Sequence, residues 1–423
     1  MNILIKSATV VDPNSSHNGK KVDILIEKGI ITEIRSSIKN DKNYKTIESG
    51  DLCVSPGWLD MQVNFRDPGF EYKEDLESGT RSAAQGGFTA VCLMPGTNPP
   101  LHSKSQIDYV VNKTRDGIVD VYPVGCISHN HEGKDIAEMY DMKQSGAVAF
   151  SDDKKALKDA GLVMRALQYS ANVGSFIITH CDDRSISLDG KMHEGETSTR
   201  MGLKGIPALA EELMVQRNIA ILEYAGGKMH LPTISTKASV ELVKHAKAKG
   251  LQITAGVAAH NLFLDDAKLS DFDSNYKVNP PLRGKEDLEA LKRGLLNGTI
   301  DVIVSDHAPE DTENKDLEFD FASDGIVALE TAFAVANTAT SGKMNSELLI
   351  EKFAINPRRI LGLAIPQIKE NEQANLTLFD PTHKWEFTKK QIRSKSTNTP
   401  FVGQTFTGKA LGIINKNGIS LAV

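Results

Sequence analysis

The sequence predicts an α/β fold, a (β/α)8 TIM barrel with a small β-sandwich domain formed by both chain termini. Two patterns carry this prediction. Eight short apolar runs, most of them followed by a helix-length amphipathic segment, occupy the middle of the chain. Both ends alternate apolar and polar residues, as half-buried strands do. The length of 423 residues accommodates one large barrel with a smaller companion domain.

Residues 1–54 are predicted to form the N-terminal part of the β-sandwich. Apolar residues alternate near Ile3 and Ile5, and short apolar runs follow over 22–26 and 30–34. The pairs Asp12-Pro13 and Lys28-Gly29 separate these runs and are typical of turns. This spacing indicates a small antiparallel sheet.

Residues 55–365 are predicted to form the barrel. Its expected strands are 58–63, 88–94, 119–125, 147–150, 175–179, 228–231, 251–256 and 301–304. Helices are expected over 103–115, 157–171, 207–216, 236–249 and 285–297. The count of eight units, and the lack of a GxGxxG motif after the first strand, favour a barrel over a doubly wound sheet.

Residues 366–423 are predicted to complete the β-sandwich. Strand-like runs lie at 375–379, 385–387 and 410–423, and Pro381, Pro400 and Gly403 separate them. We expect these runs to pair with the N-terminal strands, so that the barrel is inserted between the two halves of one small domain. The polar stretch 311–320 is expected to be a loop.

Composition excludes several classes of function. The formal charge is −6 and no basic run is present, which argues against a nucleic-acid partner. No window approaches 18 consecutive apolar residues and the N-terminus lacks a signal-peptide pattern, so we expect a cytoplasmic protein without a membrane partner. The four cysteines show no CxxC spacing, which indicates buried reduced thiols.

Polar side chains collect where the predicted strands end, which is where barrels of this kind carry their chemistry. In chain order they are Gln62, Asn64 and Arg66; Gly96, Thr97 and Asn98; His129 and His131; Ser151, Asp152, Asp153 and Lys154; His180, Asp182 and Asp183; His230 and Thr233; His260 and Asn261; and Asp306 and His307. The sequence therefore predicts a ring of candidate ligands and acid–base groups.

Eight stretches together resemble the dihydroorotase family of metal-dependent amidohydrolases. They are 56–99, GAVAFSDD (146–153), HCDD (180–183), 193–212, ISTKASV (234–240), NPPLR (279–283), SDHAPEDTENK (305–315) and NPRRILGL (356–363). The resemblance implies a barrel with a β-sandwich made from both termini, and a homodimer. It also implies reversible hydrolysis of dihydroorotate to carbamoyl aspartate, with zinc lowering the pKa of a bound water.

The chain departs from the family pattern at the expected metal ligands. The family has His-x-His after the first strand, whereas this chain has Gln62-Val63-Asn64. Amide side chains are weak, neutral ligands that rarely hold zinc. Thr233 stands where the family has another histidine, and Glu310 replaces the histidine that follows AspHisAlaPro. Gly96 replaces the asparagine that contacts substrate.

Part of the family site is retained. The resemblance assigns metal binding to Asp152 or Asp153, to His180 and to Asp306, which is also the general base. It assigns substrate contacts to Arg66 and Asn279. One imidazole and two carboxylates remain, which is enough for at most a weak mononuclear zinc site and not for a dinuclear one, because catalytic zinc has three protein ligands and an open position. We therefore expect either no metal or weakly bound zinc.

Other histidines, lysines and a cysteine have structural interpretations that we favour. His129 and His131 are expected to be solvated loop residues, with a relocated metal pair as the alternative. Lys154 and Lys155 are expected to be a solvated charge pair, with a carbamylated ligand as the alternative. His230 points away from the face of Thr233, and the thiol of Cys181 points away from His180, because side chains alternate along a strand. His193, His260 and His307 are expected to organise loops.

Two hypotheses about function follow. The first, which we favour, is a non-catalytic dihydroorotase homologue that acts as a structural partner of aspartate transcarbamoylase, a role that the resemblance implies. The second is an active cyclic-amide hydrolase that uses a depleted or mononuclear zinc site. Under either hypothesis Arg66 supplies a planar donor fork suited to a small carboxylated ring ligand.

Overall fold

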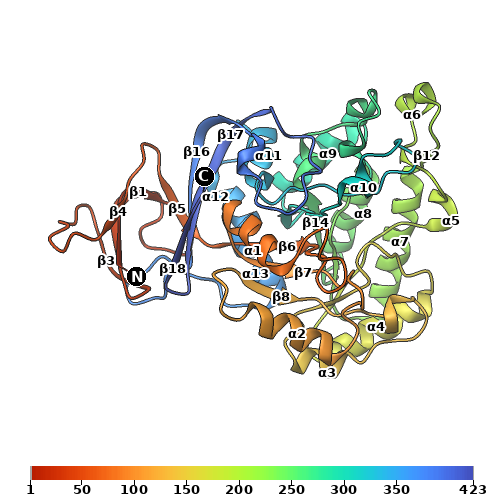
Figure 1. Cartoon of the computed structure of the whole chain (residues 1–423). Helices are drawn as coiled ribbons and strands as arrows, with labels where there is room; N and C mark the ends of the chain where they lie inside the picture. Colours follow the sequence, from red (N-terminus) through yellow and green to blue (C-terminus); the bar gives the residue numbers. More distant parts are fainter. Residues whose placement is uncertain (1, 423) are drawn as a thin grey trace.

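The computed structural model describes residues 2–422 and divides into a barrel ringed by helices and a β domain that holds both termini (Figure 1). The barrel strands are β6 (Trp58–Val63), β7 (Phe88–Leu93), β8 (Asp120–Pro123), β9 (Phe150–Ser151), β10 (Ile177–Ile178), β13 (Met229–Leu231), β14 (Ile253–Ala258) and β15 (Val302–Val304). Each lies within one of the eight predicted runs or extends past it by one or two residues.

All pairings between these barrel strands are parallel. One sheet has the order β6-β7-β8 and the other has the order β15-β14-β13-β10-β9. Single parallel bridges between Gly125 and Phe150 and between Val63 and His307 join the edges of the two sheets. The strands therefore follow one another in a ring, which confirms the predicted fold class.

The helices of the described chain follow the strands around the ring. They are α1 (Leu76–Gln85), α2 (Lys104–Thr114), α3 (Met139–Gln144), α4 (Ala160–Asn172), α5 (Arg184–Ser187), α6 (Glu196–Met201), α7 (Ala208–Ala225), α8 (Lys237–Ala248), α9 (Lys285–Leu296), α10 (Thr312–Lys315), α11 (Ala332–Ala339), α12 (Ser346–Ile350) and α13 (Asn356–Leu361). Helix α7 is longer than predicted, because helix-forming residues continue to Ala225 before Gly226 ends it.

Both ends of the chain form one hydrogen-bonded sheet. Its strands are β1 (Asn2–Val10), β2 (Lys21–Glu27), β3 (Ile30–Arg35), β4 (Lys45–Ile47), β5 (Cys53–Pro56), β16 (Leu376–Glu386), β17 (Thr405–Asn415) and β18 (Gly418–Leu421). The halves meet where β5 pairs antiparallel with β16, with Val54 opposite Leu378. The run 410–423, predicted as one strand, instead makes a hairpin, because Lys416 and Asn417 take positive φ angles between β17 and β18.

Trp58 joins the barrel to the packing around it. Its side chain has no exposed surface, and its ring packs on Phe88, Phe333, Phe353 and Phe379. Trp58 and Phe88 lie on barrel strands β6 and β7, whereas the other three rings lie on helix α11, on the segment after α12 and on strand β16. Trp58 therefore packs against both the barrel helices and the β domain. Large buried aromatic side chains dominate the energetics of such cores.

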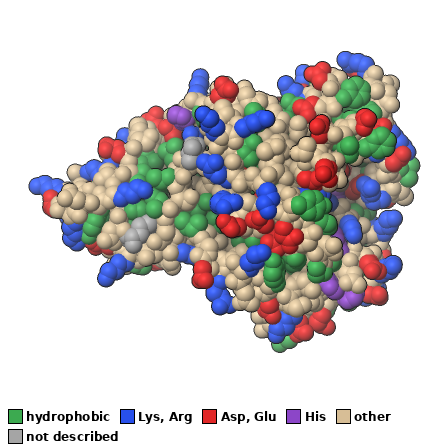
Figure 2. All heavy atoms as spheres, viewed as in Figure 1, with side chains coloured by type: hydrophobic (Ala, Val, Ile, Leu, Met, Phe, Trp, Pro, Cys, Tyr) green, Lys and Arg blue, Asp and Glu red, His purple; other side chains and the backbone are tan. Residues whose placement is uncertain are grey.

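The surface resembles that of an ordinary globular protein. Lys and Arg side chains are interspersed with Asp and Glu on the face shown in Figure 2, without a continuous basic band there. None of the helices within residues 2–422 has the length and apolar character needed to cross a membrane.

We predict that Trp58→Ala lowers the free energy of unfolding by about 3–5 kcal/mol, because it leaves a large cavity among fixed aromatic rings. Phe321→Ala is the control, since Phe321 is 75% exposed and its truncation removes little packing. Urea unfolding of both variants, followed by circular dichroism, measures the difference. Equal midpoints for the two variants would contradict the role given to Trp58.

Candidate functional site

Four of the predicted site residues, Arg66, Asp153, Asn279 and Asp306, line a cavity of about 300 Å³ at the carboxyl ends of the barrel strands, whereas Asp152 and His180 do not line it. Asn64 follows β6, Asp153 and Lys154 follow β9, and Asp306 follows β15. Asn279 enters from the loop before α9. Parallel strands direct their carboxyl ends to the same side of a barrel, so segments far apart in sequence converge here.

The two amides that replace the family histidines bind carboxylates. Gln62 Nε2 donates to Asp306 Oδ1 at 2.7 Å. Asn64 Nδ2 donates to Asp153 Oδ2 at 2.7 Å. All four side chains are buried. A buried carboxylate requires such donors, and each amide therefore supplies one of them.

The ammonium group of Lys154 contacts both Asp306 and Asn279. Its Nζ lies 2.8 Å from Asp306 Oδ1 and 2.9 Å from Asp306 Oδ2, and it donates to the carbonyl oxygen of Asn279 at 2.5 Å. The prediction of a solvated Lys154-Lys155 pair is therefore wrong for Lys154. The reason is that its ammonium group binds the buried carboxylate of Asp306 and the carbonyl oxygen of Asn279. Lys155 instead donates to the carbonyl of His131 at 3.2 Å.

The Asp306 carboxyl group lies in a strongly electrostatic environment. Only 3% of the residue is exposed. Burial raises the pKa of Asp306, and the charge of Lys154 and the hydrogen bonds from Lys154 and Gln62 act against that rise. Removing an ion from water is unfavourable unless a counter-charge and hydrogen bonds compensate. Lys154 supplies that counter-charge.

His180 and His260 are neutral imidazoles next to this charged pair. Both are almost fully buried, and neither ring makes a hydrogen bond of acceptable geometry among the described residues. Burial lowers the pKa of each ring to about 3, and the positive charge of Lys154 adds to the effect. His180 therefore keeps the lone pair that a metal ligand needs, but it faces a cation that is already in place.

The two aspartates after β9 have different roles. Asp152 accepts hydrogen bonds from the backbone N–H groups of Ile127 at 2.9 Å and Ser128 at 3.0 Å, and from the Ser128 hydroxyl. Its carboxylate therefore fixes the loop after β8. Asp153 is the one that lines the cavity, and its Oδ1 is buried without a partner in the described chain.

Arg66 does not present a free donor fork. Its Nη2 donates to Glu310 Oε1 at 2.7 Å and its Nε donates to the carbonyl oxygen of Pro309 at 3.1 Å. Lys73 donates to the other oxygen of Glu310 at 2.6 Å. Glu310, at the position of a family histidine, thus neutralises the guanidinium that was expected to hold a carboxylated ligand.

Thr233 and His230 do not form a ligand pair. Thr233 Oγ1 is buried without a partner among residues 2–422. His230 Nδ1 lies 2.8 Å from the hydroxyl of Thr254, and burial lowers the pKa of this ring to about 3. His230 is therefore a neutral residue of the strand packing.

The other candidates also have structural roles. His129 packs edge-on against His102, with ring centroids 4.8 Å apart. His131 is buried rather than solvated as predicted, because its Nε2 lies 2.6 Å from the carbonyl oxygen of Asp152.

Burial raises the pKa of the Cys181 thiol to about 12, so this thiol is a poor nucleophile. His307 Nδ1 accepts from the N–H of Ala328 at 3.2 Å.

Zinc does not fit this arrangement. Within the described residues, no group of three or more His, Cys, Asp or Glu side chains is placed to hold a metal ion. The ammonium of Lys154 already binds Asp306, and a dication there would meet repulsion from it. The amides of Gln62 and Asn64 direct N–H donors, not oxygens, at the two carboxylates.

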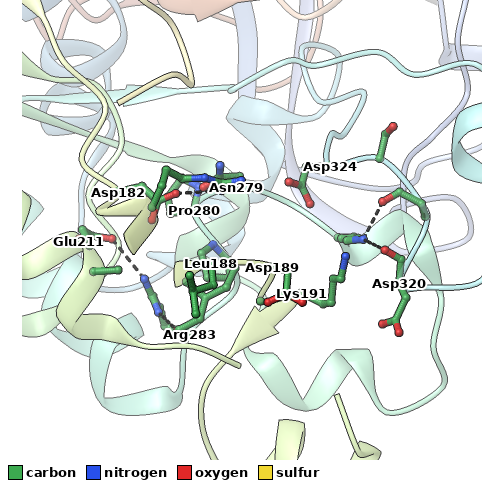
Figure 3. Close-up of a pocket in the computed structure, with 18 of the residues that line it drawn as sticks. Asp182, Leu188, Asp189, Lys191, Glu211, Asn279, Pro280, Arg283, Asp320 and Asp324 are labelled. Carbon is green, nitrogen blue, oxygen red and sulfur yellow. Dashed lines mark hydrogen bonds and ion pairs between the residues drawn. The ribbon is translucent and has the colours of Figure 1, made fainter. Parts of the chain in front are cut away.

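A second cavity, of about 390 Å³, adjoins the first and shares Asn279, Ser323 and Asp324 with it. Figure 3 shows Asp182, Glu211 and Arg283 at one end and Lys191 and Asp320 at the other. Arg283 and Glu211 are both buried and lie 3.6 Å apart, so this end is a fixed ion pair. Neither Arg283 nor Glu211 was predicted from the sequence as a site residue.

Comparison with known proteins gives one consistent result. The family model described as dihydro-orotase-like matches residues 51–239. A dihydroorotase of Trichlorobacter lovleyi is 42% identical over 97% of both chains, and one of a Geobacter species is 40% identical over 99% of both. An L-hydantoinase (dihydropyrimidinase) structure from Arthrobacter aurescens has a TM-score of 0.86 at 24% identity, with 100% of this chain and 96% of that chain covered. That structural likeness concerns the fold.

We predict that Lys154→Met destabilises the protein by about 2 kcal/mol, because it leaves the buried carboxylate of Asp306 without its counter-charge. Adding Asp306→Asn to the same chain restores most of the loss, since the uncompensated charge is then gone. Thermal unfolding of the single and double variants measures this coupling.

The matched control is Lys155→Met, which removes the neighbouring ammonium and one hydrogen bond to a backbone carbonyl. We expect this variant to unfold at nearly the temperature of the parent protein. Equal unfolding temperatures for Lys154→Met and Lys155→Met would contradict a stabilising role of the ion pair between Lys154 and Asp306.

Proposed function

Because the chain belongs to the dihydroorotase family of cyclic amidohydrolases, we propose that it is a non-catalytic member that acts as a structural partner of aspartate transcarbamoylase. The observation that carries the loss of catalysis is the ammonium of Lys154, bound to both oxygens of Asp306. The expected general base is thereby held in an ion pair.

The chemistry of the ring-opening reaction supports this proposal. Hydrolysis of an unactivated ring amide near neutral pH needs a strongly acidified water, which a bound metal ion supplies. A lysine ammonium donates hydrogen bonds to a carbonyl but does not generate hydroxide. The neutral rings of His180 and His260 add no charge that would replace the metal.

We infer aspartate transcarbamoylase as the partner from the family to which the chain belongs, and not from any surface of the structure. Non-catalytic homologues of this type are known as scaffolds for aspartate transcarbamoylase. A chain that retains the barrel fold but lacks residues that fit zinc is consistent with such a role. A homodimer and a cytoplasmic location, both expected from the sequence, are part of the same proposal.

A second candidate function is supported by one feature. His180 is a buried neutral imidazole, and Asp153 keeps one unpaired oxygen among the described residues. Together with Asp306 they are the residues from which an active cyclic-amide hydrolase with weakly bound zinc would be built. This candidate requires Lys154 to leave Asp306, which is why we rank it second.

Metal content and dihydroorotate turnover, measured together, distinguish the two candidates. We predict that protein purified without chelator holds far less than about one zinc ion per chain and shows no turnover with added zinc, cobalt or manganese. Elemental mass spectrometry and a ring-opening assay on the same sample give the answer. Near-stoichiometric zinc with turnover that chelation abolishes would establish the second candidate instead.

Restoring ligands tests whether Lys154 excludes the metal. We expect Gln62→His with Asn64→His to bind zinc weakly while Lys154 is present, and the same pair with Lys154→Gly to bind at least about tenfold more tightly. The lysine control is Lys155→Gly in the same background. Equal zinc affinity for the Lys154 and Lys155 variants would contradict the role of Lys154.

The partner is tested with purified aspartate transcarbamoylase from the same organism. We predict that sedimentation velocity of the mixture shows a species larger than either protein alone, and that this chain sediments alone as a dimer. An unrelated enzyme of similar mass is the control. Independent sedimentation of the two proteins across the accessible concentration range would contradict the partnership.

A further inference from the structure

A cavity of about 410 Å³ lies at the end of the barrel opposite the candidate site. Phe176, Lys228 and Asp301 line it, and each of them directly precedes a barrel strand. Helices α8 and α13 contribute further lining residues. The amino ends of the parallel strands meet at this end of the barrel and the carboxyl ends meet at the other. This amino-end cavity is therefore separate from the cavity around Asp306.

Part of the lining of the amino-end cavity is apolar. Phe176, Met229 and Ile253 are buried, and Leu251 and Ile360 are half-buried. Sites for small molecules in proteins combine such apolar surface with a few polar groups, and their volumes begin at about 300 Å³. The amino-end cavity therefore has the size and the apolar surface to enclose a small ring.

The charged groups of this lining are positive in excess. Lys228, Lys247 and Arg359 are its cations, and Asp301 is the one carboxylate among the described residues that line it. The two oxygens of Asp301 accept hydrogen bonds from Lys247 at 2.7 and 2.6 Å, and one of them also accepts from the backbone N–H of Ala255. Two cations of the lining therefore lack a counter-charge within it, although the whole chain has a net charge of −6.

The two cations without a counter-charge are Lys228 and Arg359. Both residues are exposed, and the Lys228 ammonium makes no hydrogen bond or ion pair within residues 2–422. Arg359 uses Nη1 to donate to Asn356 Oδ1 at 2.6 Å, and its other N–H groups have no partner in the described chain. Guanidinium and ammonium groups are the donors with which proteins bind phosphate oxygens.

The polar groups of the cavity are held in place by other residues. Asn356 Nδ2 donates to the carbonyl oxygen of Asp301 at 2.9 Å, which orients the amide oxygen that accepts from Arg359. The hydroxyl of Thr254, which also lines the cavity, lies 2.8 Å from Nδ1 of the buried His230. Groups that are oriented before a ligand arrives lose less conformational entropy when it binds.

We propose that the amino-end cavity binds a small aromatic phosphate monoester. A phosphate monoester carries a charge of about −1.5 to −2 at pH 7, which balances the two unpaired cations, whereas a carboxylate balances only one. Its ring contacts the apolar lining, where Phe176 and Met229 are side chains that pack well against aromatic groups. The inference goes beyond the proposed function and does not rest on it, because no residue around Asp306 takes part.

Calorimetric titration with three probes tests this proposal. Phenyl phosphate has both the ring and the phosphate, inorganic phosphate lacks the ring, and benzoate has the ring with a single negative charge. We expect phenyl phosphate to bind at least about tenfold more tightly than either of the other two probes. We expect Lys228→Gln and Arg359→Gln each to weaken the binding of phenyl phosphate at least about tenfold, because each removes a charged donor.

The matched control is Arg293→Gln, because Arg293 is an exposed arginine in the last turn of α9 that does not line the cavity. This variant should bind phenyl phosphate as the parent protein does. All three replaced side chains are exposed, so we expect each variant to fold. An absence of phenyl phosphate binding, or equal binding of phenyl phosphate and either other probe, would overturn the proposal. Equal effects of Arg359→Gln and Arg293→Gln would also overturn it.

Discussion

The ion pair between Lys154 and Asp306 is the interaction on which the rest of the barrel mouth depends. A buried carboxylate needs a positive charge nearby, and in a zinc-dependent member of the fold a metal ion provides it. Here an ammonium on the chain provides it, 2.8 Å from Asp306 Oδ1. With that charge in place, neutral amides are suitable neighbours, and Gln62 and Asn64 each donate one hydrogen bond to a carboxylate. The residues at positions 62, 64 and 154 thus form one consistent electrostatic arrangement.

The same logic applies to the second charged cluster. Arg66 and Lys73 share the carboxylate of Glu310, so a guanidinium that remains from the family pattern is neutralised within the protein. Each cation of the cavity therefore has an internal anion. These cations need no bound anion, whereas one carboxylate oxygen of Asp153 is left without a partner among the described residues.

The fold and the loss of ligands could both be predicted from the sequence, whereas the compensation could not. Apolar runs of strand length mark all eight barrel strands, because such strands are buried on both faces. The replacement of two histidines by Gln62 and Asn64 is visible as residue types. The partners of Lys154 are Asn279 and Asp306, which lie 125 and 152 residues away in the sequence, so no local pattern shows where its side chain points. For the same reason the sequence left Asp152 and Asp153 as alternatives, although only Asp153 lines the cavity.

A crystal structure grown with excess zinc shows whether the ammonium of Lys154 takes the place of a metal ion. Anomalous diffraction at the zinc edge reports metal independently of activity. We predict no anomalous peak between Asp153, His180 and Asp306, with Lys154 Nζ still within hydrogen-bond distance of Asp306. A strong anomalous peak there, with Lys154 displaced toward solvent, would contradict it.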